Sequence, residues 1–404
     1  MKAAYIVDGT RTPFGKFTGT LSPIRTDDLG AIPIRALAAR FQQIPGDAYD
    51  DVILGCANQA GEDNRNVARM SLLLAGLPWS VPGETVNRLC ASGLSAIIQA
   101  NRAVLAGDAD LIIAGGVEHM TRGPWVISKT SKPFGRDAEM HDSSFGWRFV
   151  NKKMAALYGT DAMGTTAENL AVLYKISRAA QDQFAYWSQR KAAQAQSSGR
   201  LAKEITAVDI PQRKSDPILF RSDEFIRANT SLEGLAKLSP AFKKIEDGGT
   251  VTAGNASGLN DGAAAVLVAS EAALKQYNLE PLARIVSSGV VGVEPRIMGI
   301  GPVGASQKAL KKAGLSLSDI GILELNEAFA AQVLACTREL GLADDDPRIN
   351  PNGGAIAIGH PLGASGTRIM HTAALELQER KEKYALVTMC VGVGQGYAAI
   401  LERI

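Results

Sequence analysis

The stretch VNRLCASGLSAII, residues 86–98, is the part of the sequence from which the fold can be argued outward. We predict a strand over residues 84–89, and apolar residues follow Cys90 at helical spacing from Leu94 onward. Cys90 is therefore expected at a strand-to-helix turn, with its sulfur at the N-terminus of the helix. Unpaired N–H groups and the helix dipole favour the thiolate at such a position. A buried structural cysteine is the alternative interpretation.

Composition places the chain among globular proteins of two or three domains. It has 404 residues, of which 46% are apolar and 21% are charged. No apolar run reaches the roughly 18 residues that a membrane helix needs, and the first residues lack the apolar core of a secretion signal. The four cysteines (Cys56, Cys90, Cys336 and Cys390) show no paired spacing. We therefore expect reduced thiols in a cytoplasmic protein without a membrane partner.

Charge is distributed unevenly along the chain. Residues 121–245 contain 20 Lys and Arg against 12 Asp and Glu, whereas the rest of the chain contains 23 against 29. The basic residues are scattered, and no nucleic-acid-binding motif accompanies them. The basic middle segment therefore predicts an anionic small molecule as the ligand and not a nucleic acid. Chance surface charge remains the alternative.

The first and last thirds of the chain share one pattern of alternating strands and helices. CASG at residues 90–93 and GASG at residues 363–366 each open a helix that leads to an apolar strand. This matching order predicts two α/β halves that arose from a duplicated unit. The expected strands are 3–8, 51–55, 111–115, 263–269 and 322–325; the expected helices are 29–41, 66–75, 306–313 and 328–340.

A third segment interrupts the two halves. From about His119 the sequence loses its clear period, and only two helices are expected there, over residues 165–174 and 177–198. An Asn-Asp-Gly turn is predicted at residues 260–262, ahead of the strand 263–269. The expected organisation is an N-terminal half (residues 1–120, completed by about 248–272), an inserted lid (residues 121–247) and a C-terminal half (residues 273–404).

Three further polar residues stand where ligands bind in open α/β sheets. Asn326 follows a buried strand, His360 precedes a helix, and Cys390 follows the strand ALVTM. With Cys90 they supply the nucleophile, base and acid that covalent catalysis needs. Taken singly, each can also be a helix cap or a packed core residue. The glycine runs match no dinucleotide or phosphate-binding motif, and no ligand spacing predicts a metal.

Five motifs together resemble the thiolase family. NRLCASG, TAGNASGLNDGAAA, NEAFAAQ, NGGAIAIGHPLGASG and MCVGVGQG occur in that family's order and span essentially the whole chain. The resemblance implies the thiolase fold, with two duplicated halves layered α-β-α-β-α and an inserted lid that holds coenzyme A (CoA). It also implies CoA and acyl-CoA as substrates, no permanently bound cofactor, and a homotetramer or dimer.

The resemblance further implies roles for the candidate catalytic residues. Cys90 would take the acyl group, His360 would accept the proton of its thiol, and Cys390 would act as acid and base. Asn326, through a water molecule, together with His360 would form one oxyanion hole. The N–H groups of Cys90 and Gly392 would form the second.

Residues that would bind CoA follow from the same motifs. The basic lid agrees with the anionic CoA tail, and Arg227 is expected at its adenine or phosphate end, with Ser257 at the pantetheine. The full set of candidates is Met163, Arg227, Phe242, Ala253, Ser257, Ala328 and Phe329.

Two stretches indicate the substrate within the family. GCANQAGEDNRNVARM at residues 55–70 and GWRFVN at residues 146–151 resemble degradative 3-oxoadipyl-CoA thiolases. The expected reaction is thiolytic cleavage of 3-oxoadipyl-CoA to succinyl-CoA and acetyl-CoA through a Cys90 acyl-enzyme. The substrate ends in a second carboxylate, so we expect Arg65 or Arg148 to bind it, or else to form a structural ion pair.

Other functions remain open on the sequence alone. Acetyl-CoA acetyltransferase (acetoacetyl-CoA thiolase) and general 3-ketoacyl-CoA thiolase need the same residues, although acetoacetyl-specific relatives usually carry His where this chain has Ala162. A decarboxylating condensing enzyme would need a different residue in place of Cys390. A non-catalytic acyl-CoA-binding protein is the alternative from another functional class.

Overall fold

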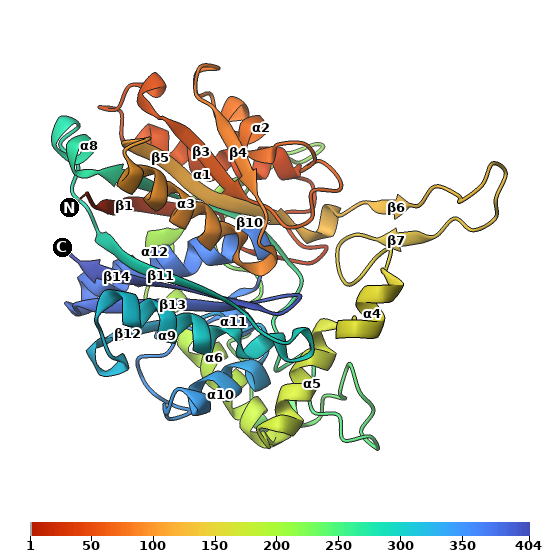
Figure 1. Ribbon diagram of the computed structural model, residues 1–404. Helices are drawn as coiled ribbons and strands as arrows, with labels where there is room; N and C mark the ends of the chain where they lie inside the picture. Colours follow the sequence, from red (N-terminus) through yellow and green to blue (C-terminus); the bar gives the residue numbers. More distant parts are fainter. Residues whose placement is uncertain (1) are drawn as a thin grey trace.

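The computed structural model describes residues 2–404, and a mixed sheet runs through the whole molecule (Figure 1). Its strand order is β12-β13-β14-β11-β1-β10-β5-β3-β4, with β2 paired to β10. β1 and β11 pair only at Tyr5–Arg284 and Ile6–Ala283. This short contact is where the N-terminal and C-terminal parts of the sheet meet.

The N-terminal half forms one end of this sheet. Its central strand β5 is parallel to β3 and antiparallel to β10, and β10 in turn is antiparallel to β1. Its elements are β1 (Ala4–Arg11), β2 (Gly15–Lys16), α1 (Thr26–Arg40), β3 (Asp51–Gly55), α2 (Val67–Leu74), β4 (Gly83–Val86), α3 (Ser92–Ala106), β5 (Leu111–His119) and β10 (Asn260–Ser270), followed by α8 (Glu271–Gln276).

The C-terminal half repeats this arrangement. β13 is parallel to β12 and antiparallel to β14, and β14 is antiparallel to β11. Its elements are β11 (Ala283–Gly292), α9 (Gly301–Ala313), β12 (Ile322–Leu325), α10 (Ala330–Glu339), α11 (Ala355–Ile358), α12 (Leu362–Arg380), β13 (Tyr384–Val391) and β14 (Gln395–Arg403). The predicted duplication is confirmed, since order and strand direction match between the halves.

Two helices form the central layer. α3 and α12 contact one another, and each also packs on strands of the sheet, whereas α1 and α9 lie on the outer faces of their respective halves (Figure 1). The predicted five-layer α-β-α-β-α architecture is therefore confirmed. One core cluster contains apolar residues of both α3 and α12, including Leu94, Ile97, Ile369 and Met370.

The central position of α3 explains its apolar composition. Among the described residues, one helical segment, Leu89–Ala106, is long enough and apolar enough to cross a membrane. The expectation that no apolar run reaches this length is therefore wrong. However, 67% of this segment is buried inside the protein. Its hydrophobicity is that of a core helix packed against β3, β5 and α12.

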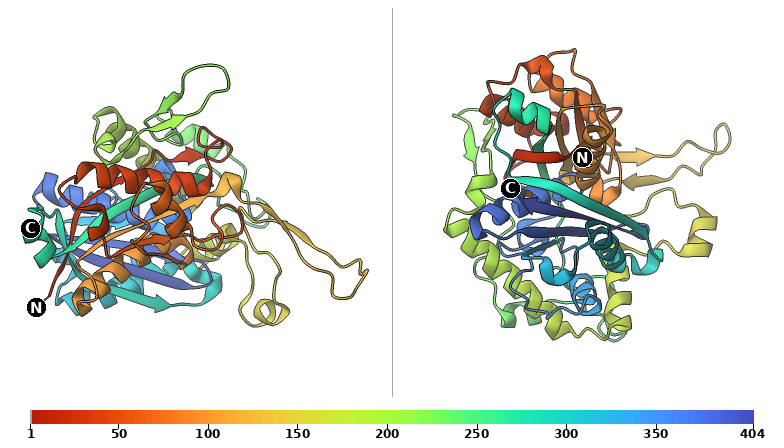
Figure 2. Two further views of the ribbon diagram at one scale, coloured as in Figure 1. Left: turned by 90° about the horizontal axis from the view of Figure 1, so that it is seen from above. Right: turned by 60° about the vertical axis from the view of Figure 1, so that its left-hand side comes forward.

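The segment between β5 and β10 extends from the body of the protein. β6 and β7 form a hairpin arm that projects well away from the sheet in all views (Figure 2). The elements of this segment are β6 (Trp125–Ile127), β7 (Met140–Asp142), α4 (Lys152–Tyr158), α5 (Met163–Leu173), α6 (Arg178–Ser197), β8 (Val208–Ile210), β9 (Ile218–Phe220) and α7 (Leu232–Ala236). The two long helices were expected, and Ser177 caps α6 as its sequence suggests.

One local prediction is wrong. Asn260, Asp261 and Gly262 do not form a turn, because they belong to β10 and pair with β2 and β5. Long-range pairing overrides the local turn preference of these residues. The side chains of Asn260 and Asp261 are buried, and the Asp261 carboxylate accepts hydrogen bonds from the backbone N–H and the hydroxyl of Thr121.

Glycines allow the central helices and strands to approach closely. A Cβ at Gly93 would overlap the carbonyl oxygen of Gly363, and a Cβ at Gly116 would overlap the same oxygen. Gly363 itself faces the carbonyl oxygens of Gly55 and Val117. The α3–α12 contact therefore requires positions without side chains, with backbone packed directly on backbone.

We expect Gly116→Ala to lower the free energy of unfolding by about 1–3 kcal/mol or more, because the new methyl group has no space. The shift of the urea unfolding midpoint measures this effect. Gly304→Ala is the matched control, since its Cβ would lie 3.4 Å from the nearest Val291 methyl, an ordinary contact. That helical position should gain about 0.5–1 kcal/mol. Equal midpoints for the two variants would contradict the packing argument.

Candidate active site

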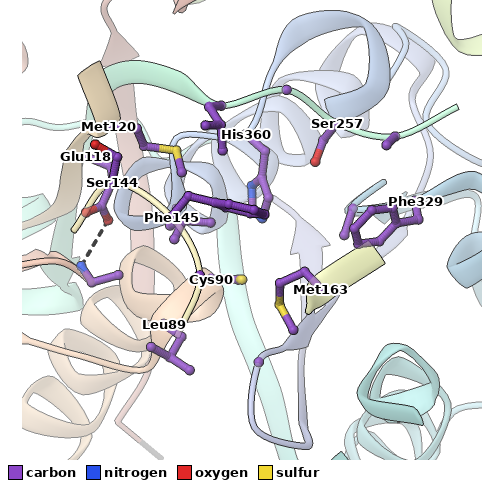
Figure 3. Close-up of a pocket in the computed structure, with 18 of the residues that line it drawn as sticks. Leu89, Cys90, Glu118, Met120, Ser144, Phe145, Met163, Ser257, Phe329 and His360 are labelled. Carbon is purple, nitrogen blue, oxygen red and sulfur yellow. Dashed lines mark hydrogen bonds between the residues drawn. The ribbon is translucent and has the colours of Figure 1, made fainter. Parts of the chain in front are cut away.

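One cavity of about 630 Å³ brings the three predicted chemical groups together. Cys90, His360 and Cys390 all line it, although 270 residues of sequence separate the first from the second. In Figure 3 the Cys90 sulfur lies at the centre of the cavity, with His360 above it. Met163, Ser257 and Phe329 lie on one side of Cys90, and Glu118, Met120 and Ser144 lie on the other, while the Phe145 ring lies above the sulfur beside His360.

Cys90 lies in a constrained turn that precedes α3. Leu89 has a φ of 47°, an unusual value for a residue with a branched side chain. The turn is held by Asn87 Oδ1, which accepts from the Leu89 N–H, and by Ser92 Oγ, which accepts from the Arg88 N–H and donates to the Leu89 carbonyl. This network fixes Cys90 two residues ahead of the first residue of α3. Strain of this kind commonly accompanies functional positions.

His360 occupies the corresponding position in the other half. It precedes Leu362, the first residue of α12, by two residues. Gly359 before it has a φ of 111°, and a side chain there would meet the carboxamide of Asn260 at 2.6 Å. Asn260 Oδ1 accepts the backbone N–H of His360 at 2.9 Å. Asn260, which was predicted to lie in a turn, is thus a strand residue whose side chain positions His360.

Hydrogen bonds define the protonation of the His360 ring. Ser365 Oγ lies 2.6 Å from His360 Nδ1 and donates its own proton to the Pro361 carbonyl at 2.8 Å. Because that proton is used, Ser365 accepts from Nδ1–H, which leaves Nε2 unprotonated. Asn326 Nδ2 lies 3.4 Å from Nε2. The ring therefore presents a proton acceptor on the Asn326 side.

Burial sets the charge state of the first thiol and the imidazole. It raises the pKa of the Cys90 thiol to about 11, although the N–H groups of Gly392 and Cys90 act in the opposite direction. Burial, reinforced by the charge of Arg368, lowers the pKa of His360 to about 3. The expectation that the helix N-terminus favours the Cys90 thiolate is therefore not met in the free protein. Desolvation outweighs the helix N-terminus, and both groups are neutral at pH 7.

Cys390 provides the second thiol. It lies near the end of β13 and is 1% exposed. Burial, together with the nearby Cys90, raises its pKa well above the ordinary value. Gly392 also lines the cavity, where an added Cβ would contact Leu89 at 3.2 Å. A neutral Cys390 can donate a proton and later accept one.

The seven predicted CoA-binding residues also line this cavity. Ser257 N–H donates to the Ala328 carbonyl at 3.0 Å, which joins the loop after residue 250 to the segment just before α10. The rings of Phe242 and Phe329 meet edge to face, with centroids 6.2 Å apart. The predicted residues found in the lining are Met163, Arg227, Phe242, Ala253, Ser257, Ala328 and Phe329.

The two candidate arginines differ in location. Arg148 lines the cavity, whereas Arg65 is exposed on the loop before α2 and does not line it. Asn326 is absent from the lining as well, although it touches the His360 ring. Lining residues that sequence reasoning missed include Asn58, Glu118, Ser143 and Phe145.

Glu118 connects several parts of the site. Its carboxylate accepts the N–H groups of Ala57, Asn58 and Gly363, and thereby joins β3, β5 and the start of α12. Burial raises the pKa of Glu118 to about 7. The sequence gives it no motif of its own, because its partners are backbone amides from distant segments.

Comparisons with known proteins assign both parts of the chain to one family. Residues 4–272 match the family described as "Thiolase, N-terminal domain", and residues 279–403 match "Thiolase, C-terminal domain". The chain is 59% identical over 404 residues to a beta-ketoadipyl-CoA thiolase of Acinetobacter baylyi, covering 100% of both chains. It is 57% identical over 404 residues to the 3-oxoadipyl-CoA/3-oxo-5,6-dehydrosuberyl-CoA thiolase of Escherichia coli, again with 100% coverage of both.

Solved structures give the same result for the fold. Human mitochondrial 3-ketoacyl-CoA thiolase in complex with CoA is 40% identical, with a TM-score of 0.91 over 100% of this chain and 98% of the other. The acetyl-CoA acetyltransferase of Bacillus anthracis is 38% identical, with a TM-score of 0.91 over 100% and 99%.

We expect alkylation of Cys90 by iodoacetamide to accelerate about tenfold per pH unit from about pH 7 to about pH 10. The thiolate fraction rises in this way at every pH below the pKa of about 11. Mass mapping of the Cys90 peptide measures the rate. N-acetylcysteine amide, with its ordinary pKa of about 8.5, serves as the control. A rate that levels off at or below pH 8 would show that the helix N-terminus dominates.

Proposed function

The chain belongs to the thiolase family, and from this premise we propose that it cleaves 3-oxoadipyl-CoA with CoA to give succinyl-CoA and acetyl-CoA. The observation that carries the proposal is the convergence of Cys90, His360 and Cys390 on one cavity. The full-length identity of 57–59% to the two relatives named for 3-oxoadipyl-CoA supports this substrate. As a thiolase the protein is an acyltransferase, and CoA is its substrate.

The first half-reaction forms the acyl-enzyme. The Cys90 thiol gives its proton to His360 Nε2, and the sulfur attacks the C3 carbonyl of the substrate. The C2–C3 bond then breaks, and its electron pair remains on C2 of the departing acetyl-CoA. Cys390 protonates that carbon, which leaves a Cys390 thiolate and a succinyl thioester on Cys90.

The second half-reaction releases the product. The Cys390 thiolate removes the proton from the thiol of a second CoA molecule, whose sulfur attacks the thioester carbonyl. Succinyl-CoA leaves when the bond to Cys90 breaks, and protonated His360 returns its proton to the sulfur. Each proton donor and acceptor is thus restored after one turnover.

Backbone and carboxamide donors stabilise the two oxyanions. The N–H groups of Cys90 and Gly392 both interact with the Cys90 sulfur, so they suit the oxyanion that forms on the carbon attached to it. Asn326, together with His360, would serve the thioester carbonyl of the departing acetyl-CoA. Asn326 is 1% exposed, which strengthens any charge-stabilising contact it makes.

The CoA substrate would enter along the side of the cavity that carries Ser257 and Phe329. Arg227 is exposed there and would meet the phosphate groups, while the apolar Met163, Phe242 and Phe329 would contact the pantetheine. All four cysteines are unpaired and buried. Because the chemistry needs two free thiols, we place the enzyme in the reducing cytoplasm. The homotetramer stays a prediction.

The first test is turnover of a substrate panel by the intact enzyme. We expect kcat/KM for 3-oxoadipyl-CoA to exceed that for 3-oxohexanoyl-CoA and acetoacetyl-CoA by at least about tenfold. Without added CoA, 3-oxoadipyl-CoA should leave one succinyl group on the Cys90 peptide and release acetyl-CoA. Cys90→Ala should show neither result. A preference for a neutral chain would support a general 3-ketoacyl-CoA thiolase instead, and absence of any adduct would support a non-catalytic binding protein.

A second prediction concerns the tautomer of His360. We expect Ser365→Ala to lower kcat by about tenfold or more, because the ring loses the acceptor that keeps its proton on Nδ1. KM should change little, and the pH profile of kcat should shift. Thr367→Val is the matched control, since the Thr367 hydroxyl is buried two residues away on the same helix without a hydrogen-bond partner. Equal activity of the two variants would disprove the role of Ser365.

A further inference from the structure

Two arginines line the cavity, and their surroundings differ. Arg227 is exposed, and its guanidinium carbon lies 5.5 Å from the centroid of the Phe225 ring. Arg148 is half-buried and follows Phe145 in the loop between β7 and α4. A half-buried arginine in a largely apolar cavity is stabilised by hydrogen-bond partners and by a counter-charge.

The hydrogen-bond partners of Arg148 are neutral. Its Nη1 donates to the Ser143 carbonyl at 3.3 Å, and its Nη2 donates to Asn58 Oδ1 at 3.1 Å. Within residues 2–404, no carboxylate forms an ion pair with Arg148. Two of its five N–H groups are thus used to orient the guanidinium. Its positive charge therefore has no directly paired carboxylate among the described residues.

Asn58 is itself fixed in the orientation that Arg148 requires. Its backbone N–H donates to Glu118 Oε1 at 3.0 Å, and its Nδ2 donates to Ser143 Oγ at 3.2 Å. The remaining polar atom, Oδ1, faces Arg148. The chain of contacts from Arg148 through Asn58 to Glu118 anchors the arginine on the Glu118 side of the cavity.

That side is opposite the side assigned to CoA. In Figure 3, Glu118 and Met120 lie on one side of the Cys90 sulfur, and Ser257 and Phe329 lie on the other. A substrate whose thioester points toward Ser257 therefore extends its acyl chain toward Met120 and Glu118. Met120, Phe145 and Leu89 provide apolar contacts for the methylene groups of such a chain.

We propose that Arg148 is a specificity-determining residue that binds the distal carboxylate of a dicarboxylic 3-oxoacyl-CoA, with Asn58 as its positioning residue. This inference rests on the proposed function and deepens it. The carboxylate supplies the missing counter-charge and accepts the N–H groups that the protein leaves free. A chain that ends in a methyl group would instead cover Arg148 and leave its charge unpaired. The subsite therefore selects for carboxylate and against neutral chains.

The test compares two matched substrates in Arg148→Gln. We expect kcat/KM for 3-oxoadipyl-CoA to fall by about 10- to 100-fold, the range typical of a lost charge-assisted contact. The value for 3-oxohexanoyl-CoA, a neutral chain of the same length, should stay within about threefold of wild type or rise. For 3-oxoadipyl-CoA, kcat/KM of Arg148→Lys should lie between the values of the wild type and Arg148→Gln. Lysine keeps the positive charge but cannot donate two parallel hydrogen bonds to one carboxylate. Retained turnover of acetoacetyl-CoA shows that the variant is folded.

The control variant is Arg65→Gln, which removes an equal charge from a loop outside the cavity. Its kcat/KM for 3-oxoadipyl-CoA and for 3-oxohexanoyl-CoA should equal the wild-type values. Equal losses on both substrates in Arg148→Gln would overturn the inference and leave a purely structural arginine. A selective loss in Arg65→Gln would overturn it as well. If the wild type itself fails to cleave 3-oxoadipyl-CoA while it cleaves the neutral chains, the proposed function fails separately.

Discussion

The direct contact between the starts of α3 and α12 is the constraint on which the site depends. Gly93 and Gly363 let these backbones touch where any side chain would collide, and Gly116 on β5 lets the sheet approach the start of α12 equally closely. Cys90 and His360 each precede their helix by two residues, so the contact that closes the core also brings the two groups together. Duplication of one folding unit thus supplies two equivalent positions, which carry a nucleophile and a base.

The same close packing determines the electrostatics. Excluding water raises the pKa of Cys90 and lowers that of His360, so the free protein holds a neutral pair. Proton transfer between them creates two opposite charges in a medium of low dielectric constant, where their attraction is strong. The N–H groups of Cys90 and Gly392 also stabilise the negative sulfur. The Cys90 thiolate therefore forms by proton transfer to His360 during the reaction and is not present in the free protein.

The sequence predicts the halves and the chemistry well, because both depend on local signals. The apolar strands, the helix starts and the small residues around Cys90 and His360 all lie within short motifs. Asn260 shows where such reasoning fails. Its local pattern predicts a turn, but pairing with distant strands makes it part of β10 and places its carboxamide on His360. Glu118 and Asn58 were missed for the same reason, since their partners come from remote segments.

The catalytic residues and the substrate-binding residues of the site come from different parts of the fold. Cys90, His360 and Cys390 come from the repeated halves, where the core holds each of them in place. The segment between β5 and β10 instead contributes Arg148, Met163 and Arg227, all from loops or helix starts near the surface. Such positions can change without disturbing the central helices, because few core contacts depend on them. Substrate preference in this architecture can therefore diverge while the two thiols and the imidazole stay fixed.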